Sequence, residues 1–68
     1  MGTSNKLSDI LFASRVSRGL SQEGMAELCG ISTRHYSDLE QGKVNPRLTT
    51  TVRIFTRLGI SLDILKEG

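Results

Sequence analysis

A group of hydrogen-bonding side chains at helical spacing, between residues 33 and 38, could recognise a surface that offers donors and acceptors. The group consists of Thr33, Arg34, Ser37 and Asp38. Tyr36 and Leu39 are three residues apart and would bury the opposite face of the same helix. An exposed polar helix face next to basic loops is typical of a helix that meets the edges of base pairs in the major groove.

The basic residues are unevenly distributed along the chain. The stretch from Arg34 to Arg57 carries five basic and two acidic residues, a net charge of +3, whereas the rest carries four basic and five acidic residues, a net charge of −1. This asymmetry indicates an anionic partner. Charge alone leaves open a solvated surface that has no partner.

The length of the chain excludes several classes of protein. Sixty-eight residues can build only one domain, residues 1–68, with little room for both a packed core and a walled pocket. With one histidine and no glycine-rich phosphate loop, we expect neither an enzyme nor a bound cofactor. The lone Cys29 excludes a disulfide framework and a cysteine-based zinc site, so no metal is expected. No apolar run approaches the ~20 residues of a membrane span, and no export signal begins the chain, so a cytoplasmic location is expected.

The pattern of glycines predicts the scaffold that positions the polar side chains. Glycine follows stretches of helical apolar spacing at Gly19, Gly30, Gly42 and Gly59. Serines that can cap a following helix come soon after three of these glycines, at Ser21, Ser32 and Ser61. We therefore expect an all-α fold of five short helices and no sheet. The fourth helix would span residues 48–58, and the fifth would be a short turn after Ser61.

The apolar spacing also predicts which side chains face the core. The predicted inward residues are Leu7, Ile10, Leu11, Phe12, Val16, Met25, Ala26, Cys29, Tyr36, Leu39, Leu48, Val52, Phe55 and Leu58. Two of the helices meet across residues 29–32, a turn centred on Gly30 that suits a crossing angle of about 90–120°. Ala26 supplies the small side chain that such a close crossing requires.

The run GLSQEGMAELCGISTRHYSDLEQGKVNP, followed by LGISLDIL, closely resembles the lambda-repressor and Cro-like helix-turn-helix family of bacterial and phage regulators. The resemblance covers residues 11–65 and joins several separate motifs at fixed spacings. It implies a compact five-helix bundle of the lambda-repressor-like DNA-binding type, in which helices 2 and 3 form the helix-turn-helix. The chain departs from the family pattern at Gly24, where a helix-favouring residue is usual and glycine costs about 1 kcal/mol. Ser14 and Thr51 also occupy positions that are usually apolar.

The resemblance implies that three residues of the third helix contact bases, namely Thr33, Arg34 and Asp38. Arg34 would donate to guanine O6 and N7, and Thr33 would contact a thymine methyl group. Asp38 would either accept from a cytosine amino group or orient Arg34 from four residues away, and we favour orientation.

The resemblance also implies contacts with the DNA backbone and one internal ion pair. Phosphate contacts are implied for Gln22, Ser32, Ser37, Lys43, Asn45 and Arg47. Gln22 could instead support a base-reading side chain. Arg15 and Glu40 match a partly buried salt bridge that would join the first helix to the end of the third. The alternative for this pair is two independent surface charges.

The implied function is sequence-specific binding of double-stranded DNA by a transcriptional regulator, a repressor, with residues 32–39 in the major groove. It would act as a homodimer on a palindromic operator, with Leu62 or Ile64 of the last helix, residues 61–66, at the dimer contact. The protein would be bacterial or phage-encoded and associated with the nucleoid. Asp38 on the readout face and the modest net charge of +2 leave one alternative, a protein-interaction module, antitoxin-like or adaptor, on the same scaffold.

Overall fold

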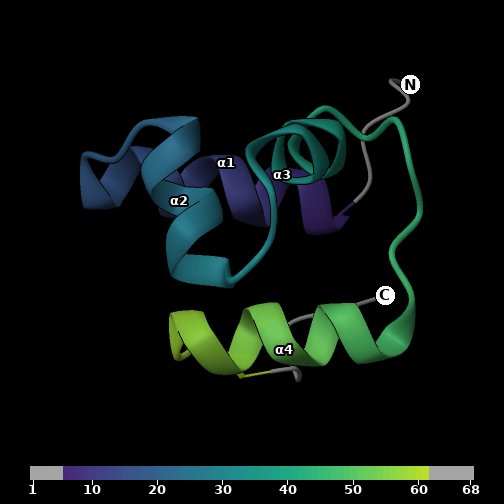
Figure 1. The fold of residues 1–68 in the computed structure, drawn as a ribbon. Helices are drawn as coiled ribbons and strands as arrows, with labels where there is room; N and C mark the ends of the chain where they lie inside the picture. The colour runs from purple at the N-terminus through teal and green to yellow at the C-terminus, as the bar shows by residue number, and fades with distance from the viewer. Residues whose placement is uncertain (1–5, 62–68) are drawn as a thin grey trace.

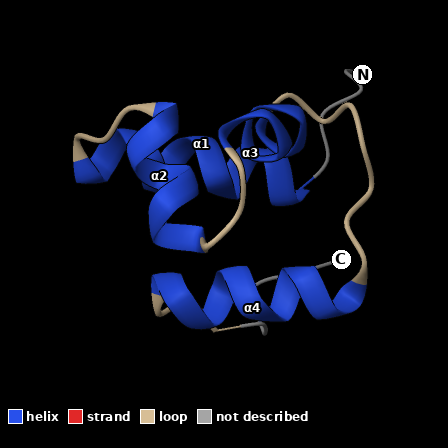
Figure 2. Ribbon diagram, viewed as in Figure 1, coloured by secondary structure: helices blue, strands red, loops and turns tan. Residues whose placement is uncertain are grey.

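The computed structural model describes residues 6–61, and these contain four α-helices and no strand (Figures 1 and 2). The helices are α1 (Lys6–Arg18), α2 (Gln22–Cys29), α3 (Thr33–Glu40) and α4 (Leu48–Leu58). Helices α1, α2 and α3 form one group, and the loop after α3 leads to α4, which lies along one side of that group (Figure 1). This arrangement agrees with the expected all-α class and helix-turn-helix.

The prediction of five helices is wrong, because residues 6–61 contain four. Helix α4 ends at Gly59, which takes the left-handed conformation at φ +72°, and Ile60 and Ser61 are not helical. The fifth helix was predicted mainly in residues 62–66, which lie outside the described residues. The evidence for it was one capping serine and three apolar residues. So short a segment predicts a helix poorly, because the first turn of a helix is costly to nucleate.

The ends of α2 and α3 follow directly from the local sequence. The side chain of Ser21 accepts a hydrogen bond from the Gly24 amide at 3.1 Å, and that of Ser32 accepts one from the His35 amide at 3.0 Å. Each serine therefore caps the helix that the sequence predicted for it. Gly30 ends α2 at φ +77°, a conformation in which L-residues with a Cβ atom are strained.

The core is built from all four helices. Its buried apolar residues are Leu7, Leu11, Met25, Ala26, Cys29, Tyr36, Leu39, Ile54, Phe55 and Leu58. The predicted inward faces of α2 and α3 are confirmed by this set. In α1, however, Phe12 and Val16 are 53% and 57% exposed, because the inward stripe is narrower than predicted and runs through Leu7 and Leu11.

The predicted inward face of α4 is rotated from the one observed. Leu48 is 75% exposed and Val52 is 38% exposed, so their placement in the core was wrong. The buried stripe instead runs through Thr51, Ile54, Phe55 and Leu58, at the spacing i, i+3, i+4 and i+7. Thr51 can lie in this stripe because its hydroxyl donates a hydrogen bond to the Arg47 carbonyl at 3.2 Å, which satisfies the buried polar atom.

Gly24 occupies the interior of α2 without any close contact that requires a glycine. A Cβ atom built there would lie 3.5 Å from Leu20 Cδ2 and 3.5 Å from Ser21 Oγ, which is ordinary van der Waals contact. The glycine therefore costs helix stability without an evident packing benefit.

We expect Gly24→Ala to raise the free energy of unfolding by about 0.5–1 kcal/mol, because alanine restricts the unfolded chain and favours the helix. The matched control is Gly59→Ala, whose Cβ would meet no atom within 4 Å but which must adopt φ +72°. This control should lower stability by roughly 1 kcal/mol. Thermal and urea denaturation of both variants measure the effect, and a destabilised Gly24→Ala would show that α2 depends on this glycine.

Candidate nucleic-acid interface

Helix α3 is buried on one side and open on the other. Tyr36 and Leu39 are 0% and 1% exposed and pack into the core against α1 and α2. Thr33 and Arg34 are exposed at the start of the helix, and Asp38 is half-buried one turn later. The structure therefore presents the predicted polar face of α3 outward, over a rigid apolar support.

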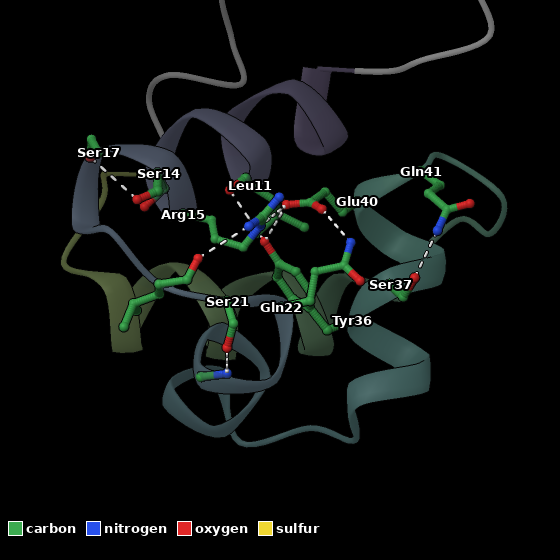
Figure 3. A network of polar contacts seen from close by, with 12 residues as sticks. Leu11, Ser14, Arg15, Ser17, Ser21, Gln22, Tyr36, Ser37, Glu40 and Gln41 are labelled. Carbon is green, nitrogen blue, oxygen red and sulfur yellow. Dashed lines mark hydrogen bonds and ion pairs between the residues drawn. The ribbon is translucent and has the colours of Figure 1, made fainter.

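A network of polar side chains surrounds the carboxylate of Glu40, at the last residue of α3 (Figure 3). Arg15 Nε of α1 lies 2.7 Å from Glu40 Oε2, so the expected ion pair between these residues is present. Gln22 Nε2 of α2 donates to Glu40 Oε1 at 2.6 Å, and the Tyr36 hydroxyl donates to Oε2 at 2.9 Å. One carboxylate thus connects α1, α2 and α3.

Further hydrogen bonds hold the partners of Glu40 in place. Arg15 Nη1 donates to the Leu20 carbonyl at 3.1 Å, between α1 and α2. The Tyr36 hydroxyl also lies 3.3 Å from the Leu11 carbonyl. No buried side-chain nitrogen or oxygen among the described residues lacks a partner, so the network is fully satisfied.

The ionisation of this network follows from its geometry. Burial alone would raise the pKa of Glu40, but the hydrogen bonds from Arg15, Gln22 and Tyr36 outweigh it and lower that pKa below 4.5. The carboxylate in turn raises the pKa of Arg15, mainly through their hydrogen bond. Burial, and then the hydrogen bond to Glu40, raise the pKa of Tyr36, so its hydroxyl stays protonated and acts as a donor.

The contacts of Gln22 and Asp38 within the chain bear on their predicted roles without testing them. Gln22 opens α2 as predicted, but its amide nitrogen is already engaged with Glu40. Within residues 6–61, Asp38 forms no ion pair with Arg34, so the structure holds no contact through which Asp38 would orient that side chain. The role of each residue toward DNA stays a prediction.

The remaining predicted phosphate contacts lie at the two ends of α3 and in the loop that follows. Ser32 is exposed and caps the start of the helix, whereas Ser37 Oγ accepts from Gln41 Nε2 at 2.7 Å near its end. Lys43, Asn45 and Arg47 are all exposed in the loop between α3 and α4. The Lys43 amide donates to the Asp38 carbonyl at 2.9 Å, which fixes the start of this loop against α3.

The positive charge of the stretch from Arg34 to Arg57 is not neutralised within the described residues. Its basic side chains are exposed, and none forms an ion pair there; they are Arg34, Lys43, Arg47, Arg53 and Arg57. These charges are therefore available to an external anion.

Sequence reasoning missed a contact that ties α1 to α4. Arg18 Nη2 donates to the Leu58 carbonyl at 2.7 Å, and Arg18 Nε donates to Ser14 Oγ at 3.1 Å. A basic residue in the last turn of α1 was the only local signal, because its main acceptor is 40 residues away in sequence.

Residues 6–61 enclose no pocket, and they contain no group of three histidine, cysteine, aspartate or glutamate side chains that could hold a metal. Of the four helices, none is long and apolar enough to cross a membrane.

Comparison with known proteins matches residues 11–65 to the helix-turn-helix family. The chain is 41% identical over 54 residues to the SPbeta prophage-derived uncharacterized HTH-type transcriptional regulator YonR of Bacillus subtilis, covering 79% of this chain and 50% of that protein. It is 38% identical over 63 residues to the HTH-type transcriptional regulator DdrOP3 of Deinococcus deserti, covering 93% of this chain and 49% of that protein. It is 33% identical over 55 residues to an uncharacterized HTH-type transcriptional regulator of Haemophilus influenzae, covering 81% of this chain and 56% of that protein. The chain thus spans about half the length of these relatives.

We expect Glu40→Gln to lower the free energy of unfolding at pH 7 by about 1–3 kcal/mol, because a neutral amide cannot balance Arg15 or accept from all three donors. Folding lowers the pKa of Glu40, so its ionised form contributes stability above pH 4.5 that is lost as pH falls through the lower folded-state value. The difference between wild type and variant should therefore shrink as pH falls below 4.5. Urea denaturation across pH 3–7 measures this difference.

The control for this measurement is Glu27→Gln, which removes an exposed carboxylate of α2 that forms no ion pair within residues 6–61. Its effect should stay within about 0.5 kcal/mol at every pH. A Glu40→Gln difference that did not change with pH would show that the charge of Glu40 contributes nothing to stability.

Proposed function

This chain belongs to the helix-turn-helix family, and on that premise we propose that it binds double-stranded DNA in a sequence-specific manner and regulates transcription. The observation that carries the proposal is the outward polar face of α3 beside basic residues that no ion pair neutralises within the described residues. The relatives from Bacillus subtilis and Deinococcus deserti, which are named as transcriptional regulators, support it. Residues 32–39 would lie in the major groove.

The start of α3 would read the bases. Thr33 and Arg34 are exposed in its first turn, where recognition helices of this motif meet base edges. A guanidinium bound to guanine O6 and N7 discriminates by about 1–3 kcal/mol against another base. Asp38, which is not paired with Arg34 in the structure, would accept from a cytosine amino group or orient Arg34 once DNA is bound.

The DNA backbone would be contacted at both ends of α3. Ser32 at its start, and Lys43 and Arg47 in the loop after it, are exposed and could meet phosphates. Asn45, Ser37 and Gln22 complete the proposed set of phosphate contacts. Contacts of this kind set the register and most of the affinity, whereas base contacts set sequence preference.

We further propose that the protein acts as a homodimeric repressor on a palindromic operator. One recognition helix reads only a few base pairs, and a dimer spaces two copies about 34 Å apart, one turn of the duplex. The predicted dimer contact at Leu62 or Ile64 lies outside the described residues. We also propose that the protein is bacterial or phage-encoded and is associated with the nucleoid in the cytoplasm. Its relatives, which include a prophage-derived regulator, support this.

A second candidate function is a protein-interaction module, antitoxin-like or adaptor, on the same scaffold. It is favoured by Asp38, an acid on the face that would meet a polyanion, and by a net charge of only +2. The two candidates differ in their dependence on salt, because only the binding of nucleic acid releases condensed counterions.

We expect DNA binding to weaken steeply with salt, with a slope of log K against log salt near −4 per subunit for four or five neutralised phosphates. Selection of bound sequences from a random duplex pool, followed by titration of the recovered site at several salt concentrations, tests this. The symmetry of the recovered sites shows whether a dimer binds. Affinity that did not change between low and moderate salt would favour the protein-interaction module.

Two matched substitutions separate base contacts from phosphate contacts. Arg34→Ala should relax preference at one or two base positions, whereas Lys43→Ala should weaken binding to all sequences about equally and reduce the salt slope by about 1. Repeating the selection with each variant, and comparing affinities for single-base variants of the site, measures both effects. A uniform loss of affinity in Arg34→Ala would show that Arg34 does not contact a base.

A further inference from the structure

The side chain of Arg57 in α4 lies against Gly30, in the turn between α2 and α3. A Cβ atom built on Gly30 would stand 3.4 Å from Arg57 Cζ, 3.4 Å from Nη1 and 3.5 Å from Nη2. Nearly equal distances to three atoms of one planar group mean that the guanidinium presents its face, rather than an edge, to Gly30. These distances are ordinary van der Waals contact for a Cβ atom, so Gly30 is required by its φ of +77° and not by the nearness of Arg57.

The turn that Arg57 covers sets the direction of α3. The Gly30 amide donates to the Glu27 carbonyl at 3.1 Å and the Ile31 amide donates to the Ala26 carbonyl at 3.0 Å, which closes the end of α2. Ser32 then caps α3 two residues after Gly30. A group that restrains the backbone at Gly30 therefore restrains the angle between α2 and α3.

Arg57 lies at the end of α4 that a hydrogen bond joins to α1. Leu58, the next residue, accepts the 2.7 Å hydrogen bond from Arg18 of α1. The Arg57 side chain forms no hydrogen bond or ion pair within the described residues, and the face of its guanidinium lies over Gly30. Its charge also reaches Cys29, because the charges of Arg18 and Arg57 partly offset the larger rise in the Cys29 pKa that burial causes.

We propose that Arg57 is a positioning residue for DNA recognition, whose guanidinium packs on the turn at Gly30 and fixes the angle at which α3 is presented. The inference rests on the proposed DNA-binding function. It requires the planar guanidinium and not only the charge, because a lysine ammonium is a compact, strongly hydrated group that does not stack on a backbone. A lysine would serve equally well if Arg57 acted only on the helix dipole of α2.

The experiment compares Arg57→Ala and Arg57→Lys with Arg53→Ala, which removes an exposed charge one turn earlier in α4. The affinity of each variant is measured for the duplex recovered by selection and for a scrambled duplex, after thermal unfolding has shown that it is folded. Both Arg57 variants should lower the ratio of the two affinities about fivefold to tenfold, which is what a weakened base contact costs. Arg53→Ala should weaken binding to both duplexes alike and leave their ratio unchanged.

Hydrogen exchange of the free protein supplies a readout that does not depend on DNA. The Ile31 amide should exchange faster in both Arg57 variants and not in Arg53→Ala, because the turn opens more often when the guanidinium is absent. Arg57→Lys with the wild-type ratio and wild-type exchange would overturn the inference. So would Arg57→Ala with an unchanged ratio and a salt slope smaller by about 1, since that is the behaviour of a phosphate contact. A wild-type protein that bound neither duplex would overturn the proposed function itself.

Discussion

The presentation of α3 depends on one buried carboxylate. Glu40 has a side chain only 6% exposed, and a charge in such a place is tolerated only when donors surround it. The donors come from Arg15 in α1, Gln22 in α2 and Tyr36 in α3 itself. Because all three must reach the same two oxygen atoms, the end of α3 can take only one place relative to the other helices. This constraint and the burial of Tyr36 and Leu39 in the core together leave the polar face of α3 outward.

The two ends of α3 are held by different physical means. At its end, directional hydrogen bonds to Glu40 leave little freedom, since each loses strength quickly with distance and angle. At its start, Gly30 supplies a left-handed turn over which the guanidinium of Arg57 packs. A domain of this size has few apolar contacts to spare, so polar contacts between helices carry much of the specification of the fold. Burial of an ion pair is weak evidence for stability, but a fully satisfied network restricts the number of arrangements available to the chain.

The predictions that succeeded depended on neighbours in sequence. Ser21 and Ser32 cap their helices, and Gly30 and Gly59 end theirs, because caps and left-handed glycines act over three or four residues. The face of α4 could not be found in this way. In α4, Val52 lies outside the core and Thr51 lies within it, whereas hydropathy alone predicts that the valine is the buried residue of the two. The hydroxyl of Thr51 is buried at little cost because it bonds to the preceding turn, which a pattern of apolar residues does not register.

The sequence by itself determined the helix boundaries, the buried faces of α2 and α3, and the family to which the chain belongs, because these follow from local backbone chemistry and from motifs at fixed spacing. It also pointed to the pair Arg15 and Glu40 through a resemblance. Only the tertiary structure decided that Gln22 joins that pair, that Arg18 bonds to the end of α4 and that Arg57 lies on Gly30. These contacts join residues 18 to 40 positions apart. No local preference encodes such contacts, because they exist only after the helices have packed and brought the partners within bonding distance.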